Sequence, residues 1–413
     1  MSASRQVNPF QSRAWLSLFF CFLIASTGCD SKTTSSPNLT LPPADSGTSS
    51  ANSEPRVTVA EAEAFAEAWE NCIETGEGKA GGELISWIGI VNRTLKPFKV
   101  DAEFRKGFTR GALSKIGPSF IDQMKTVLDN GGSYQLVKVI SRAGKRHVVF
   151  RVVDPNSGLN YHDFQLERSN GKVRASHFFI AATGEEFADT LRNLVAPAIA
   201  SSNSTFGKLN GEQTRQLKTL DDLKKMREAV NAGKKEKVLA IYNSLPAKSQ
   251  EMKVILIMKM QYLDIEADEA TYLETIDQYT KLFPNDPSLG LVTLDAAYLR
   301  KDFALLEQAR SSLQTWTGGD PYVDLVIGNL LAELNKVEEA VQLTKDIDPG
   351  PLGLADAHDF KLTIALANKD YPSVLKGLRA LRDQFGYQFS DLRDAEGFEG
   401  FVDSPEFSEW TAD

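Results

Sequence analysis

Residues 334–340, with the sequence LNKVEEA, stand at the centre of a motif that recurs along the C-terminal half of the chain. A polar dipeptide followed by an apolar residue recurs at intervals of about 34 residues, as Lys301-Asp302-Phe303, Asn335-Lys336-Val337 and Lys369-Asp370-Tyr371. Asp286-Pro287 recurs in the same way as Asp320-Pro321. This period predicts stacked units of two helices each, because one helix pair cannot bury its own apolar face.

These units resemble tetratricopeptide repeats. LNKVEEA is similar to the inter-helix turn of that family, with Asn335 where Gly is usual, and Phe283-Pro284-Asn285 is similar to its repeat-ending proline. Gly328 matches the small residue of the first helix, whereas Leu294 and Leu362 depart from it. The resemblance implies an all-α tetratricopeptide-like solenoid of about four or five units over residues 211–388, with residues 389–413 as a helical cap.

The resemblance also implies a groove, lined by first helices, that binds a peptide or a partner helix. Carrying the family geometry onto this chain places seven residues near that groove: Asp295, Tyr298, Tyr322, Asn329, Glu333, Asp356 and Asp359. They are acidic and aromatic rather than basic, so we expect a neutral or basic protein partner. A spacer without a partner is the alternative for this half of the chain.

Residues 57–199 are predicted to form an α+β domain with helices packed on a four-stranded antiparallel sheet. Four segments alternate in polarity and are rich in Val, Ile, Phe and Tyr, which predicts strands at Tyr134–Ser141, Lys145–Val153, Asn160–Arg168 and Lys172–Ala181. The connections hold Gly, Asn, Asp and Pro, residues that suit hairpin turns.

Helices are expected before and after these strands along the chain. Thr58-Val59-Ala60-Glu61 is a capping-box sequence and predicts a helix over 59–75, with Cys72 as a buried, inert thiol on its apolar face. Further helices are expected over 82–92, 101–115 and 118–130, and a closing helix from Thr183. The element order resembles the cone-shaped folds of the nuclear-transport-factor-2 and cystatin groups.

Three of the four histidines, His147, His162 and His177, fall in the predicted strands. If the turns set the register, Phe150 faces His162 and Phe164 faces His177. Alternation then places His162 and His177 on one sheet face and His147 on the other, which argues against a three-ligand metal site. Histidines among aromatic residues are typical of a satisfied core or a pocket wall, so we expect no metal and no cofactor.

The other sheet face is predicted to be polar, with Tyr161, Asp163, Gln165 and Arg151. A solvent-exposed face is the simpler interpretation. The alternative is a small-ligand-binding protein or an enzyme with a cavity in the α+β domain, lined by Tyr161, His162, Asp163 and His177. No P-loop, HExxH, GxSxG or CxxC pattern occurs, and Gly76–Gly81, although it matches GxGxxG, follows a helix rather than a strand. We therefore assign no catalytic residue.

The first 28 residues are predicted to be a signal peptide. Arg5 and Arg13 precede an apolar run over 14–25 that would rise about 18 Å as a helix, less than the roughly 30 Å of a bilayer core. Ser26-Thr27-Gly28-Cys29 resembles the bacterial lipobox, with Ser26 where Leu is usual. The resemblance implies that Cys29 is the acylated first residue of the mature chain; a secreted protein without lipid is the alternative.

Residues 29–56 are rich in Ser, Thr and Pro and predict a disordered tether, and residues 200–210 predict a linker. The net charge is −9 without a basic run, which argues against a nucleic-acid partner. The sequence thus predicts a lipoprotein on the periplasmic side of the inner or outer membrane. Its expected function is that of a protein–protein interaction scaffold.

Overall fold

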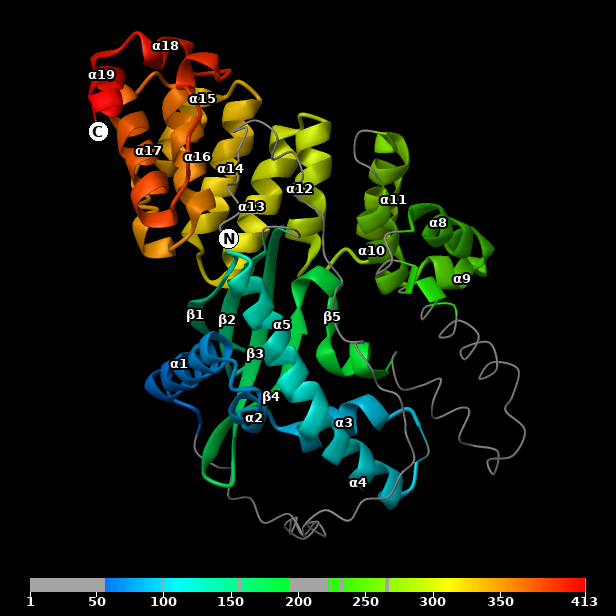
Figure 1. Ribbon diagram of the computed structural model, residues 1–413. Coiled ribbons are helices and arrows are strands. Elements are labelled where there is room, and N and C mark those ends of the chain that lie inside the picture. The colour runs from blue at the N-terminus through cyan, green and yellow to red at the C-terminus, as the bar shows by residue number, and fades with distance from the viewer. Residues whose placement is uncertain are drawn as a thin grey trace.

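The computed structural model describes residues 56–98, 100–154, 158–192, 222, 225–226, 228–229, 234–263 and 267–412. An antiparallel sheet with its helices forms the N-terminal part, and helices alone form the C-terminal part (Figure 1). The predicted signal peptide, Cys29, the tether and the linker lie outside the described residues.

The sheet has five strands in the order β1-β2-β3-β4-β5, all antiparallel to their neighbours: β1 Ser133–Arg142, β2 Lys145–Asp154, β3 Gly158–Ser169, β4 Lys172–Ile180 and β5 Glu185–Glu186. The first four agree with the predicted strands. The two-residue β5 was expected to be helix. A 3-10 turn over 181–183 and Gly184, with a φ of 62°, reverse the chain there, so that helix begins only at residue 187.

In the described residues from 56 onward, five α-helices precede the sheet: α1 Val59–Thr75, α2 Gly78–Glu83, α3 Trp87–Leu95, α4 Ala102–Gly111 and α5 Gly117–Asp129. The capping box is confirmed, since the Glu61 N–H donates to Thr58 Oγ1 at 3.2 Å and the Thr58 N–H donates to Glu61 Oε2 at 2.9 Å. The predicted single helix over 82–92 is wrong. Ile85 instead bridges to Ala175 on β4, and this extended contact separates α2 from α3.

A π-helical segment, η1 Ala112–Ile116, joins α4 to α5 without a break. Pro118 lies in the first turn of α5 and has no N–H to donate to the carbonyl of Ser114. The Gly117 N–H donates to the carbonyl of Ala112, five residues back, as a π turn requires. Gly81 lies within α2 and allows this helix to pack closely on α5, because a Cβ there would lie 2.6 Å from Ile121.

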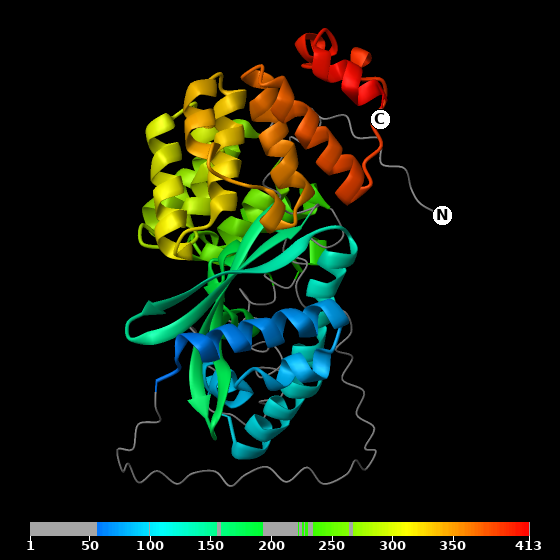
Figure 2. The same ribbon diagram turned by 90° about the vertical axis from the view of Figure 1, so that its left-hand side faces the viewer.

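One face of the sheet packs against α1 and α5 through an aromatic core. Phe164 is fully buried, and its ring lies 4.5 Å from that of Phe178 and 5.0 Å from that of Trp69. Figure 2 shows α1 crossing this face. Cys72 is buried here as predicted, and burial raises the pKa of its thiol.

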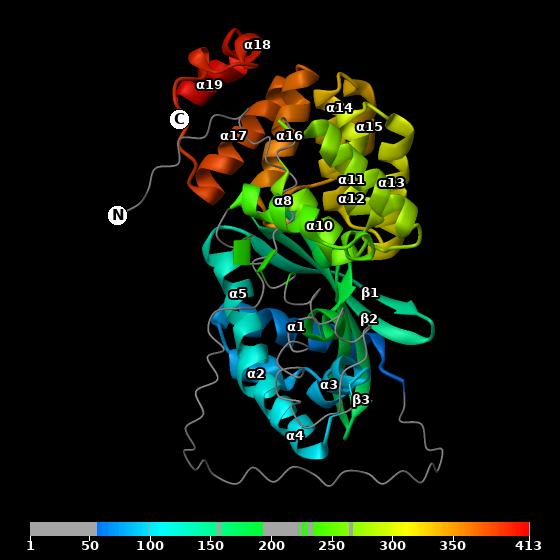
Figure 3. The ribbon, with the colours of Figure 1, turned by 90° about the vertical axis from the view of Figure 1, so that its right-hand side faces the viewer.

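The C-terminal part consists of helices α8 Lys235–Ser244, α9 Ala247–Gln250, α10 Lys253–Tyr262, α11 Glu269–Leu282, α12 Leu289–Leu299, α13 Phe303–Thr317, α14 Pro321–Glu333, α15 Val337–Thr344, α16 Ala355–Ala367, α17 Tyr371–Phe385, α18 Glu399–Val402 and α19 Pro405–Ala412. Helices α12 and α13, α14 and α15, and α16 and α17 pack as consecutive pairs (Figure 3). Phe398, Phe401 and Phe407 at the C-terminal end share a core with α17.

The period of the motif is present in the backbone. Lys301, Asn335 and Lys369, which are equivalent positions of successive repeats, have φ values of 53°, 61° and 56° in the connections within the three pairs. The residue after each donates its N–H to the carbonyl five positions back, at 2.8 to 2.9 Å. These are helix-ending turns with a left-handed residue, the position that Gly or Asn favours. The second helices α13, α15 and α17 begin two residues after these turns, at the positions that the motif predicts.

Candidate functional site

His162 is a core histidine. Its side chain is fully buried, with Nδ1 3.1 Å from the hydroxyl of Tyr134 and Nε2 3.4 Å from Nδ2 of Asn160. The indole N–H of Trp69 donates to the same tyrosine hydroxyl at 3.0 Å. Burial lowers the pKa of His162 to about 3, so the imidazole is neutral at physiological pH. A ligand in solvent has no access to it, which agrees with the interpretation of a satisfied core residue.

His177 lies on the opposite sheet face from His162, and its predicted placement is therefore wrong. Phe150 does face His162, as predicted, but Phe164 pairs with Phe178, and His177 pairs with Gln165. The register shifts next to Gln165, where β4 contains one extra residue. Beyond this bulge every side chain of β4 changes face. His177 Nε2 lies 3.0 Å from Glu186 Oε2 of β5.

The polar sheet face is covered by the C-terminal helices, so it is neither the solvent-exposed surface nor the open groove that the sequence suggested. Arg151 and Tyr161 are 3% and 0% exposed, and both reach Asp320 at the start of α14. An Arg151 guanidinium N–H donates to Asp320 Oδ1 at 2.7 Å, and the Tyr161 hydroxyl donates to Oδ2 at 2.8 Å. We call this contact surface the sheet–helix interface.

Trp316, near the end of α13, fills the apolar part of the sheet–helix interface. Its ring meets those of Tyr161 and Phe179 edge-on, at 5.7 and 5.8 Å between centroids. The guanidinium of Arg142 lies over the same ring, 5.5 Å from its centroid, and donates to the Trp316 carbonyl. Asp163 is 7% exposed, and its Oδ1 lies 2.8 Å from Nδ1 of His147 on β2.

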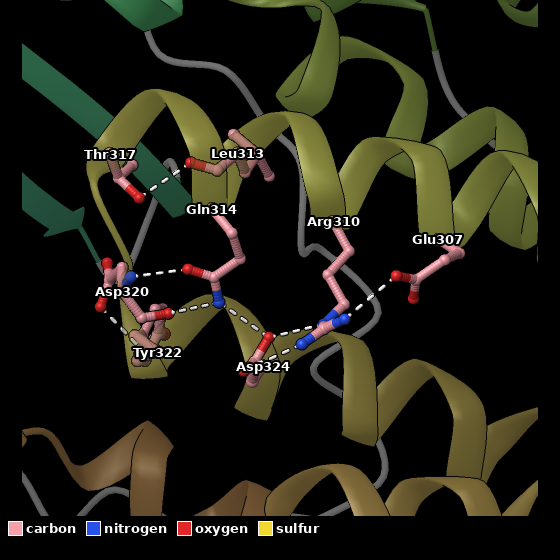
Figure 4. A network of polar contacts seen from close by, with 8 residues as sticks. All are labelled: Glu307, Arg310, Leu313, Gln314, Thr317, Asp320, Tyr322 and Asp324. Atoms are coloured by element: carbon pink, nitrogen blue, oxygen red, sulfur yellow. Dashed lines mark hydrogen bonds and ion pairs between the residues drawn. The ribbon is translucent and has the colours of Figure 1, made fainter.

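Hydrogen bonds with nearby residues of α13 and α14 hold Asp320 in the position from which it contacts the sheet (Figure 4). Its carboxylate caps α14 by accepting from the N–H of Tyr322 at 3.0 Å. Gln314 of α13 accepts from the Asp320 N–H at 2.7 Å and donates to Asp324 at 2.7 Å. Arg310 also donates to Asp324, at 2.7 Å, so α13 holds the first turn of α14 through several polar contacts.

The sheet–helix interface extends to the connections that precede other helices. The hydroxyl of Ser288, just before α12, donates to the carbonyl of Ala181 at 2.7 Å. Nζ of Lys253 on α10 donates to the carbonyl of Gly184 at 2.7 Å and also pairs with Asp286, the equivalent of Asp320 one repeat earlier. Further along, Val153 of β2 shares an apolar cluster with Leu354, just before α16.

Three of the residues predicted for the groove come together on two different helices. The Tyr298 hydroxyl of α12 donates to Glu333 Oε2 at 2.9 Å, and the Asn329 amide donates to Glu333 Oε1 at 2.9 Å, both on α14. Glu333 is exposed and Tyr298 is half-buried. We call these three residues the acidic cluster; its carboxylate has no cation beside it among the described residues.

The other four predicted groove residues are placed differently. Tyr322 is 1% exposed and lies beneath Arg151, 5.0 Å from its guanidinium, so it belongs to the sheet–helix interface. Asp295 is 6% exposed and accepts from the Tyr272 hydroxyl; burial raises its pKa to about 8. Asp356 and Asp359 are half-buried, and burial together with Asp356 raises the pKa of Asp359 to about 7. Tyr322 and Asp295 are therefore too deeply buried to contact a partner in the predicted groove.

A cleft of about 520 Å³ lies among α15, α16 and α17. Its charged lining is balanced, with three lysines and three aspartates: Lys345, Lys361, Lys376, Asp346, Asp348 and Asp370. His358 also lines it but is 7% exposed, and burial lowers the pKa of its imidazole. Among the described residues, no group of three or more His, Cys, Asp or Glu is arranged to hold a metal.

Comparison with family models, curated proteins and solved structures finds no match for this chain. Crossing a bilayer would take a longer and more apolar helix than any in the described part of the chain. The geometry of the chain itself therefore carries the functional argument.

The sequence did not identify the Arg151–Asp320 contact or the role of Trp316. A signal for the first was available, because an Asp before a Pro and an apolar run is a helix cap whose charge must be balanced if it is buried. Nothing local indicated that the balancing cation lies 169 residues away on β2.

Proposed function

We propose that this protein is a membrane-anchored extracytoplasmic lipoprotein whose C-terminal helices form a tetratricopeptide-like solenoid that docks a protein partner. The solenoid is supported by the left-handed turns at residues 301, 335 and 369 and by the packing of consecutive helix pairs. The membrane anchor rests on the lipobox-like sequence at Cys29.

The acidic cluster is the observation that carries the docking proposal. It joins first helices of two consecutive pairs, α12 and α14, which is where a solenoid groove is lined. It offers an exposed carboxylate at Glu333 and an aromatic ring at Tyr298. A lysine or arginine side chain of a partner fits this combination, because its charge pairs with the carboxylate and its methylene stem packs on the ring.

The α+β domain holds the helices in place rather than binding a ligand in this proposal. Of the four residues that the ligand-binding alternative requires, His162 and Tyr161 are fully buried, and Asp163 is engaged with His147. We therefore propose the scaffold function alone.

Site-specific photocross-linking tests the docking surface. A photoreactive benzoylphenylalanine is placed at Tyr298 in one strain and, as a matched control, at Phe303, which begins the second helix α13 and is 39% exposed. After irradiation of intact cells, we expect a defined protein adduct from position 298 alone. The adduct should decrease at least tenfold when Glu333→Lys is added. Equal adducts at both positions, or none at either, would contradict the proposal.

The lipid anchor has a separate test. We expect metabolic labelling with an alkyne-bearing fatty acid to mark the wild-type protein, and Cys29→Ser to abolish the label. A label that persists in Cys29→Ser would refute the assignment.

A further inference from the structure

Helices α3, α4 and η1 lie at the end of the molecule farthest from α14–α19, as the three ribbon views show (Figures 1, 2 and 3). Residues 87–116, which span these elements, contain seven Lys or Arg and two acidic residues, a net charge of +5. The whole chain has a net charge of −9, so the sign of the charge is reversed at this end.

Four of these cations are exposed and have no ion pair within the described part of the chain: Lys96, Lys106, Arg110 and Lys115. The other two arginines of this segment donate hydrogen bonds within the protein. Arg93 donates to the Ser176 carbonyl at 2.6 Å, and Arg105 donates to Asn92 at 2.8 Å. Of the two acids, Asp101 caps α4 by accepting from the N–H of Phe104, and Glu103 is exposed in the first turn of the same helix. Because cations outnumber acids seven to two in this segment, the local charge is positive.

Apolar side chains stand among these cations. Ile88 on α3 is 59% exposed, the highest value for a large apolar side chain among the described residues, and Leu113 on η1 is 39% exposed. Helix α4 buries no residue. Helix α3 contacts both α4 and η1, which keeps Ile88 on the same end of the domain as Leu113. Exposed apolar side chains within a basic surface are the pattern of a membrane-interface site.

We propose that this basic tip, formed by Ile88, Lys96, Lys106, Arg110, Leu113 and Lys115, docks on anionic phospholipid headgroups. The cations attract the lipid phosphates, and Ile88 and Leu113 enter the headgroup region. The inference rests on the proposed membrane anchor and adds an orientation to it: the α+β domain lies on the bilayer, and the acidic cluster faces away from it. The net negative charge of the rest of the chain disfavours any other orientation on an anionic surface.

Vesicle co-sedimentation of the unacylated mature chain, residues 29–413 with Cys29→Ser, isolates this contact from the lipid anchor. Vesicles contain either phosphatidylcholine alone or an equimolar mixture of phosphatidylcholine and phosphatidylglycerol. We expect binding to the anionic vesicles only, and its loss in about 0.5 M salt. The variant Lys96→Gln, Lys106→Gln, Arg110→Gln and Lys115→Gln should bind at least about fifty-fold more weakly.

The matched control removes four exposed lysines from the C-terminal part: Lys237→Gln, Lys248→Gln, Lys281→Gln and Lys301→Gln. It should retain wild-type binding although its net charge is the same as that of the test variant. Equal binding by the two variants, or no binding of the starting protein to anionic vesicles, would overturn the inference. Because acylation of Cys29 is measured separately, such a failure leaves the proposed anchor standing, and loss of acylation leaves this measurement valid.

An environment-sensitive label reports the apolar contact. A nitrobenzoxadiazole group on Ile88→Cys should gain at least twofold in fluorescence on anionic vesicles, whereas the same label on Lys301→Cys should not change. Cys72 is buried and does not compete for the reagent. No gain at position 88 in protein that co-sediments would show that another surface makes the contact, and would overturn the proposal.

Discussion

The two faces of the sheet are both buried, but by different kinds of contact. One face packs on α1 and α5 through stacked rings, with Phe164 fully buried between Trp69 and Phe178. The other face meets the C-terminal helices through the ring of Trp316 and also through an ion pair and a tyrosine hydroxyl bond, both at Asp320. Apolar packing tolerates several arrangements, whereas a buried charge requires its partner at one place. Apolar packing therefore stabilises both faces, and on the second face the ion pair also fixes how the two parts are oriented.

The largest expected effect is on the aromatic face. Phe164→Ala should lower the free energy of unfolding by about 3–5 kcal/mol, because it removes a fully buried ring and leaves a cavity. Urea denaturation followed by near-ultraviolet circular dichroism measures it. Phe303→Ala, at a 39% exposed position, should cost less than about 1 kcal/mol. Similar losses from the two variants would break the comparison.

The polar face gives the next effect. Asp320→Ala removes the carboxylate from Arg151 and Tyr161 and should lower the free energy of unfolding by about 3 kcal/mol, since it leaves a buried cation unpaired. The same denaturation assay measures it. Asp302→Ala removes a helix cap without an ion pair and should cost about 1 kcal/mol. If Asp320→Ala cost no more than its control, the interface would not depend on the ion pair.

Asp295 sharpens the comparison, because it is a buried carboxyl group that meets a tyrosine hydroxyl instead of a cation. Burial raises its pKa to about 8 in the folded state, against about 3.8 when unfolded. The unfolded chain therefore releases this proton first, and stability is lost as the pH rises from about 4 to about 8. Relative to Asp295→Asn, the wild type should lose at least about 2 kcal/mol over that range. Parallel stability curves for the two proteins would contradict the assignment.

The smallest effect is expected in the repeated turns, which lie outside both faces. Lys369→Gly should raise the free energy of unfolding by about 0.5–1 kcal/mol, because a φ of 56° strains a lysine but not a glycine. Thermal unfolding of the variant and the wild type measures this gain. Lys376→Gly, within α17, should instead lower it by about 1 kcal/mol. A loss at both positions would show that the left-handed turn is not a source of strain.

Local patterns predicted the local structure. Alternation located four strands, the capping box located α1, and the repeated motif located the turns at residues 301, 335 and 369. Errors arose where one residue changed a register. The bulge beside Gln165 moved His177 to the other face, and the bridge from Ile85 to Ala175 interrupted a predicted helix.

Contacts between distant segments could not be predicted in the same way. Arg151 and Tyr161 look like solvent-exposed residues on an alternating strand, and Tyr322 looks like a groove residue on a first helix. They are buried together because the two parts of the chain pack face to face, and no local periodicity encodes that arrangement. The residues of the acidic cluster were selected by carrying the tetratricopeptide geometry onto this chain, and three of the seven lie together.

The attachments at Lys253, Ser288, Asp320 and Leu354 occur one after another along the helical part. The first two hold the turn over residues 181–184 that follows β4, and the last two hold β2. An array of helix pairs in which each pair contacts only its neighbours can bend and extend along its length. Contacts between one edge of the helical part and the α+β domain remove most of this freedom to bend. If these helices dock a partner as we propose, that partner would meet a surface whose shape is already set, and little of its affinity would be lost in ordering the helices.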